Sequence, residues 1–140
     1  MSNLVQRKVD TLIKLMLTTG VQPSELVDNI YLNDYKSIKY YKVDSNILGE
    51  LIFEESTGKY TVEVALKYVY NAEKMLLRIE EEVHGQVNVL WDRNNTESEL
   101  INEIISLLKQ SYSTNEVNKF ITSLPNELAK KLMLNYKLTA

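Results

Sequence analysis

The side chains best suited to metal or acid-base chemistry are Glu80, Glu82 and His84, which recur at every second position. Alternate residues of a β-strand share one face, so two carboxylates and an imidazole could approach a divalent ion there. Neighbours on one face lie about 7 Å apart, however, and need a further partner to draw them together. We therefore interpret the three residues as a solvated strand face that ends in a turn, and we expect no metal ion and no other cofactor.

The rest of the sequence is poor in catalytic groups. His84 is the single histidine and there is no cysteine, which excludes multi-histidine metal sites, cysteine nucleophiles, zinc-thiolate sites and disulfides. The glycines are isolated from one another, so no phosphate-binding loop of the Walker or dinucleotide type is present. We expect a non-enzymatic protein, and the absence of cysteine fits a reducing, cytoplasmic setting.

The composition is that of a globular protein with a small acidic surplus. The 140 residues are 44% apolar and 25% charged, and the net charge of -3 lacks the basic excess typical of nucleic-acid binding. No stretch approaches the roughly 18 uninterrupted apolar residues that span a bilayer. Abundant tyrosine, asparagine, lysine and isoleucine indicate an AT-rich genome, such as that of a low-GC bacterium or its phages.

Tyrosines and acidic residues favour contact with another protein. Tyr40 and Tyr41 are adjacent, so in a strand one of them must point away from the core. Tyrosine has a large apolar ring with one polar tip and is enriched at interfaces for that reason. Both tyrosines also fit an ordinary sheet rim.

Two acidic runs could recruit a basic partner or mimic nucleic acid. One is Glu54 with Glu55, and the other consists of Glu80, Glu81 and Glu82. Runs of this kind are also common on solvated surfaces.

The last predicted helix, which follows Pro125, is apolar around more of its circumference than one packing partner requires. We assign Leu132 and Tyr136 to contact with another chain. With the tyrosines and the acidic run, these residues lead to a hypothesis. The chain would be a small, acidic interaction module that binds a partner protein and itself, such as a phage or mobile-element accessory or inhibitor protein.

A strand at residues 60–70 organises the predicted fold, because its even-numbered positions are apolar or aromatic. Residues 38–43 and 47–54 predict two further strands, joined by a turn at residues 44–46. A glycine-containing loop at residues 56–59 connects the second of them to the organising strand. These three strands are expected to pair antiparallel.

Residues 72–83 fit either a helix or a strand. Asn71 could cap a helix that ends at Gly85. Alternation of apolar and charged residues, followed by a His84-Gly85 turn and an alternating run at residues 87–91, favours a strand instead. We favour the strand. With a helix there, the order helix, three strands, helix, strand, helix resembles that of bacterial secretion chaperones, which are also small and acidic.

Two helices are predicted before the strands, at residues 4–17 and 24–31. Their outline is also that of a helix-turn-helix, so weak nucleic-acid binding through residues 4–31 is one alternative function. The second helix exposes Glu25 and Asp28, which phosphates repel. We therefore favour a helical hairpin packed on the sheet.

The C-terminal third predicts two to three helices, which start at Thr96, at Ser113 or Thr114, and at Pro125. The expected fold is α+β and forms one domain over residues 1–140. It consists of the N-terminal helical pair, an antiparallel meander of about five strands, and C-terminal helices that cover its apolar face.

A second alternative function follows from this fold. A pocket between sheet and helices could bind a small ligand, with tyrosine hydroxyls and Arg78 or Arg93 as orienting groups.

Overall fold

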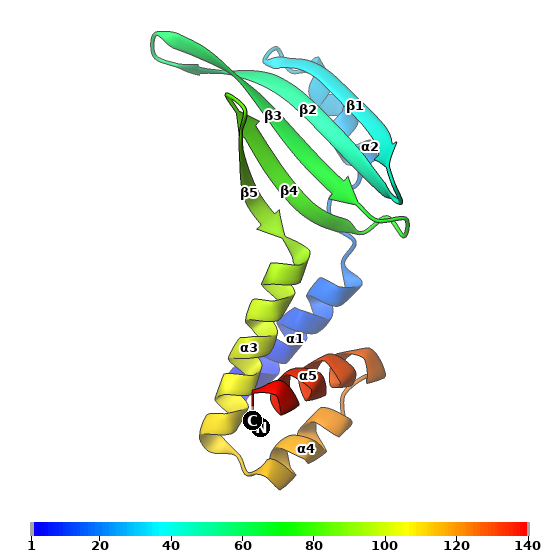
Figure 1. Cartoon of the computed structure of the whole chain (residues 1–140), viewed down its shortest axis with the longest axis vertical. Coiled ribbons are helices and arrows are strands. Elements are labelled where there is room, and N and C mark those ends of the chain that lie inside the picture. Colours follow the sequence, from blue (N-terminus) through cyan, green and yellow to red (C-terminus); the bar gives the residue numbers. More distant parts are fainter. Residues whose placement is uncertain (1, 140) are drawn as a thin grey trace. The chain divides into compact units, whose positions relative to one another are not determined.

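The computed structural model describes residues 2–139 as an α+β protein with a five-stranded antiparallel sheet and five α-helices (Figure 1). The chain divides into two compact units. Residues Thr18–Asn94 form the sheet unit, and the described residues up to Leu17 and from Asn95 onward form the helical unit. The α+β class, the antiparallel sheet and the helices before and after it are as the sequence predicts.

The sheet is a meander in which each strand pairs antiparallel with the next one in the chain. The strands follow from the alternating sequence, and tight turns set the order in which they pair. Several of these turns use positive φ, at Asp44, Gly58, His84 and Gly85. The strands are β1 (Tyr35–Val43), β2 (Asn46–Thr57), β3 (Tyr60–Tyr70), β4 (Leu76–Val83) and β5 (Gln86–Asp92).

The ambiguous segment at residues 72–83 contributes β4, so the strand prediction is confirmed. Asn71 caps a turn here, because its Oδ1 atom accepts hydrogen bonds from the backbone nitrogens of Glu73 (3.0 Å) and Met75 (2.9 Å). The helical alternative is wrong, and with it the element order shared with secretion chaperones.

The second N-terminal helix is shorter than predicted. The segment expected as a helix at residues 24–31 forms one α-helical turn, α2 (Pro23–Leu26), followed by the 3₁₀ helix η1 (Val27–Tyr31). It lies behind β1 and β2 in Figure 1. The helix-turn-helix alternative is therefore not formed, because α2 is too short to serve as a reading helix and belongs to a different unit from α1 (Asn3–Leu17).

Two tyrosines of the sheet hold the segment that leads into α2. The Tyr70 hydroxyl donates to the carbonyl oxygen of Val21 over 2.7 Å, and the Tyr40 hydroxyl donates to that of Pro23 over 3.0 Å. Burial raises the pKa of both phenols, which keeps them neutral donors. The two hydroxyls thus fix the backbone around the start of the short helix, where the Pro23 carbonyl also accepts from the Val27 backbone nitrogen.

The helical unit has a core of its own, to which four helices contribute. They are α1, α3 (Arg93–Ser111), α4 (Thr114–Thr122) and α5 (Asn126–Leu138). Among the residues described, the buried members of this core are all helical, so the four helices bury these apolar faces against one another. The fully buried members include Val9, Leu12, Ile104, Leu108, Val117, Ile121, Leu128 and Leu132.

The predicted starts of α4 and α5 are confirmed, and that of α3 is displaced. Ser113 caps α4 in a reciprocal capping box with Glu116, and Pro125 precedes α5. α3 begins at Arg93 rather than at Thr96, because β5 ends at Asp92 and passes directly into the helix.

Candidate functional site

The strand register decides which side chains share a face of the sheet. Leu66 of β3 lies opposite Glu81 of β4, and Lys67 lies opposite Glu80. Directly paired residues point to the same face and consecutive residues to opposite faces. We call the face with Leu66 and Glu81 the hollow face, and the face with Lys67 and Glu80 the polar face. Tyr70, which reaches the segment before α2, is also on the hollow face.

The predicted acidic surface at Glu80 to Glu82 is divided between the two faces. On the polar face Glu80 accepts from Arg78 Nε at 2.9 Å, and Glu82 accepts from Lys67 Nζ at 2.8 Å. The hydrogen bond to Glu82 raises the pKa of Lys67. Glu81 lies on the hollow face and forms no ion pair with any residue of the described range. Of the three carboxylates, Glu81 is therefore the one available to a partner.

The hollow face carries a surface hollow of about 700 Å³ that combines apolar and acidic side chains. Glu54 and Ser56 also line it, although the strand register assigns them to the polar face. The apolar lining of the hollow comes from β2, β3 and β5, and its carboxylates come from β2, β4 and the segment before β1. The lining residues are Phe53, Leu66, Leu90, Asp34, Glu54, Glu55, Ser56 and Glu81.

The apolar side chains of this hollow are held in place but remain accessible. The rings of Phe53 and Tyr35 pack with centroids 5.1 Å apart. Leu90 is the extra residue of a β-bulge, because Trp91 pairs with Ile79 while Val89 pairs with Glu80. The Leu90 side chain is 54% exposed. The bulge thus presents an apolar side chain that regular pairing would not place there.

The carboxylates give the hollow a negative character. Glu54 is paired with Lys36 at 2.6 Å, and this hydrogen bond raises the pKa of Lys36. Asp34, Glu55 and Glu81 form no ion pairs within residues 2–139 and add three negative charges around the apolar lining. A partner with both apolar and basic side chains would complement this surface.

The polar face has a smaller hollow of about 370 Å³ that includes Glu82 and His84. Glu82 is already bound to Lys67, and Glu80 does not line this hollow. Within residues 2–139, no three or more histidine and carboxylate side chains are grouped so that they could hold a metal ion.

The two adjacent tyrosines point to opposite faces. The Tyr40 ring lies over Gly49 on the hollow face, where an added Cβ atom on Gly49 would approach Tyr40 Cε1 to 2.6 Å. Tyr40 therefore has a structural role. Tyr41 is on the polar face and is 43% exposed, so it is the member of the pair open to a partner.

The prediction for α5 needs correction at Leu132. That side chain is fully buried in the helical core and is unavailable to a partner. Tyr136 is half-buried, and Lys109 Nζ lies 5.5 Å from its ring centroid. The exposed leucines of α5 are Leu134 and Leu138. Helix α5 therefore has apolar side chains on its exposed side as well as its buried side, but the exposed ones are Leu134 and Leu138 and not Leu132.

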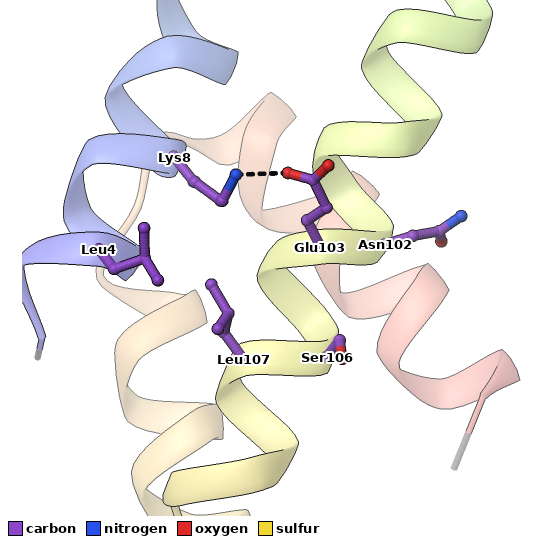
Figure 2. A pocket seen from close by; sticks show the side chains of 6 residues that line it. All are labelled: Leu4, Lys8, Asn102, Glu103, Ser106 and Leu107. Carbon is purple, nitrogen blue, oxygen red and sulfur yellow. Dashed lines mark hydrogen bonds and ion pairs between the residues drawn. The ribbon is translucent and has the colours of Figure 1, made fainter.

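A groove between α1 and α3 is a third candidate surface (Figure 2). Lys8 Nζ and Glu103 Oε2 approach to 2.5 Å across it, and Leu4 and Leu107 line it nearby. Because its two charges neutralise each other, the groove offers little to select a ligand by charge.

The orienting arginines of the ligand-pocket alternative are engaged elsewhere in the sheet unit. Arg78 is bound to Glu80. Arg93 is 6% exposed and donates to the carbonyl oxygens of Leu76 and Thr18. Neither arginine lines the 700 Å³ hollow described above.

Sequence reasoning singled out the carboxylates of the hollow at Glu54, Glu55 and Glu81 but missed its apolar half. Phe53 precedes the acidic pair directly, which is a usable signal. Leu90 was not predictable, because its position depends on a bulge in the β4–β5 pairing.

No helix among residues 2–139 has the length and apolarity needed to cross a bilayer. Comparison with protein-family models, with curated proteins and with solved structures gave no significant match.

Proposed function

We propose that this chain is a non-enzymatic protein-binding module that holds a basic and apolar segment of its partner on the hollow face of the sheet. The observation that carries this proposal is the placement of Phe53, Leu66 and Leu90 in one hollow with the unpaired carboxylate of Glu81. The module therefore differs from the sequence-based hypothesis in its site, which excludes Leu132 and uses only one residue of the acidic run.

The two components of the hollow have separate physical roles. Burial of apolar surface contributes about 25 cal/mol per Å² removed from water, so covering these side chains supplies affinity. Carboxylates around an apolar contact attract lysine and arginine, speed the encounter and repel acidic competitors. The same carboxylates oppose the approach of a phosphate backbone, which supports a protein rather than a nucleic acid as partner.

The single tryptophan provides a direct binding assay. Trp91 pairs with Ile79, at a position on the hollow face, and neighbours Leu90 in the chain. Its fluorescence is followed while the protein is titrated with a synthetic peptide of alternating leucine and lysine. A peptide of alternating leucine and glutamate, equal in length, serves as the comparison. We expect saturable binding of the basic peptide and none of the acidic one.

A pair of matched variants distinguishes binding of the peptide at the hollow from its general attraction to an acidic protein. Glu81→Lys reverses a charge in the hollow, and Glu73→Lys makes the same change in the exposed turn before β4. We expect Glu81→Lys to weaken binding of the basic peptide at least about tenfold, equivalent to about 1.4 kcal/mol. Glu73→Lys should leave binding nearly unchanged. Equal effects of both variants, or equal binding of both peptides, would contradict the proposal.

A further inference from the structure

We infer that β5 is a self-association edge, at which the sheet pairs antiparallel with β5 of a second copy of this chain. This inference concerns the open edge of the sheet and does not rest on the function proposed for the hollow.

The two edges of the sheet differ in charge. β1, at one edge, carries Lys36, Lys39 and Lys42. β5, at the other edge, has no charged residue from Gln86 to Trp91. Lysines on an edge strand discourage pairing with another chain, whereas an uncharged edge leaves its backbone groups open to it. β5 is therefore the edge that another strand can join.

The turn before β5 determines which backbone groups face outward. Val83 and Gln86 flank the two-residue turn at His84 and Gly85 and so exchange hydrogen bonds with each other. Alternation along an antiparallel pair then directs the N–H and C=O groups of Val87 and Val89 away from β4. Val87 and Val89 are 47% and 55% exposed, and no turn, loop or cap hydrogen bond within residues 2–139 engages their backbones.

The sequence of β5 is complementary to itself in one register. With Asn88 opposite Asn88 of the second copy, Val87 lies opposite Val89 in both directions around a two-fold axis. Val87 and Val89 both have outward-facing backbone groups, so these residues exchange hydrogen bonds across the interface. Their β-branched side chains also meet on the same face, which is a favourable cross-strand pairing.

The self-complementary register favours a second copy as the occupant, and the lack of charge on the edge permits its approach. Two chains of net charge -3 repel one another, and an uncharged edge is where they can approach with least repulsion. Pairing of one short strand buries less than the roughly 800 Å² per partner of a standard interface. The dimer should therefore be weak and form in the micromolar to millimolar range.

The test is molar mass by light scattering from about 10 µM to about 1 mM, a range that spans weak association. We expect the mass of the wild type to rise toward twice that of the monomer. Val87→Lys with Val89→Lys places charges on the edge and should weaken association at least tenfold. The matched control, Val87→Thr with Val89→Thr, keeps β-branched neutral residues and should associate like the wild type.

A second measurement on the wild type does not depend on how the variants fold. Amide hydrogen exchange at Val87 and Val89 should slow as concentration rises, while exchange at the outward-facing Tyr40 and Lys42 amides of β1 should not change. A monomer at every concentration would overturn the inference. So would a dimer that survives the lysine pair but is lost when Leu134 and Leu138 of α5 are changed to lysine, because association would then belong to α5.

Discussion

The Nε atom of Arg93 donates a hydrogen bond of 2.7 Å to the carbonyl oxygen of Leu76, which ties the start of β4 to the end of β5. Its Nη2 atom donates to the carbonyl oxygen of Thr18 over 2.9 Å, and the guanidinium lies 5.4 Å from the Trp91 ring centroid. One buried cation thus holds three segments of the sheet unit together.

Replacement of Arg93 should destabilise the sheet unit. Arg93→Met keeps much of the side-chain volume but leaves the carbonyls of Leu76 and Thr18 without these donors, so we expect a loss of about 2 to 4 kcal/mol in urea unfolding. Arg78→Met is the matched control, because it removes an arginine whose side chain is 44% exposed and ion-paired. The control should cost less than about 1 kcal/mol. Equal losses of stability in the two variants would show that the buried hydrogen bonds of Arg93 do not stabilise the sheet unit more than an exposed ion pair does.

Gly49→Ala should destabilise the protein by about 1 to 3 kcal/mol, the usual cost of overpacking. The new Cβ atom would lie 2.6 Å from Tyr40 Cε1, and the Tyr40 ring is fixed by its hydrogen bond to Pro23. Tyr40→Ser removes the ring, so adding Gly49→Ala to that variant should cost much less. Thermal unfolding of the wild type, the two single variants and the double variant measures this coupling. Simple additivity would refute the steric explanation.

Tyr70→Phe should lower stability by about 1 to 2 kcal/mol at neutral pH, because the carbonyl of Val21 loses its donor. Burial, and then the neighbouring Tyr40, raise the pKa of Tyr70, so the folded state favours the neutral phenol. Its contribution is therefore complete below the unfolded-state pKa of about 10 and is lost as pH rises through the folded-state pKa.

The difference between wild type and Tyr70→Phe should consequently shrink above about pH 10. Unfolding by urea at a series of pH values measures it. Tyr60→Phe, at a side chain that is 73% exposed, should match the wild type at neutral pH. A difference between wild type and Tyr70→Phe that stays constant to high pH would contradict the role assigned to the neutral phenol.

Leu132→Ala should cost about 2 to 5 kcal/mol, because it leaves a cavity in the helical core. Leu134→Ala, at a neighbouring exposed leucine of α5, should change stability by less than about 0.5 kcal/mol.

The same pair of variants tests the prediction of one domain. Trp91 fluorescence reports on the sheet unit, and far-UV circular dichroism reports mainly on the helices. One cooperative domain requires that both signals shift together in Leu132→Ala. Separate transitions would mean that the two units unfold independently.

The elements could be predicted from the sequence where local chemistry determines them. β3 and β5 follow from alternation, and the start of α4 follows from the spacing of Ser113 and Glu116. The choice between helix and strand for β4 depended on the turn at His84 and Gly85, a local signal as well.

The packing partners of these elements could not be predicted in the same way. An apolar stripe shows that a helix needs a partner but not which one, so the shared core of the four helices could not be predicted. For the same reason Leu132 was assigned to an outer surface, although Leu134 and Leu138 are the exposed leucines of α5. The hollow was missed in part because it joins residues of separate strands around a bulge.

The division into two units also bears on how the chain folds as it is synthesised. The sheet unit is one continuous segment, Thr18–Asn94, inserted between α1 and the later helices. All its strands have been made before α4 and α5 exist, so the meander can close early. The apolar face of α1, with Val5, Val9 and Leu12, must wait for residues far downstream before it is buried. During that interval α1 of the nascent chain presents a hydrophobic helix face that other chains or chaperones can bind.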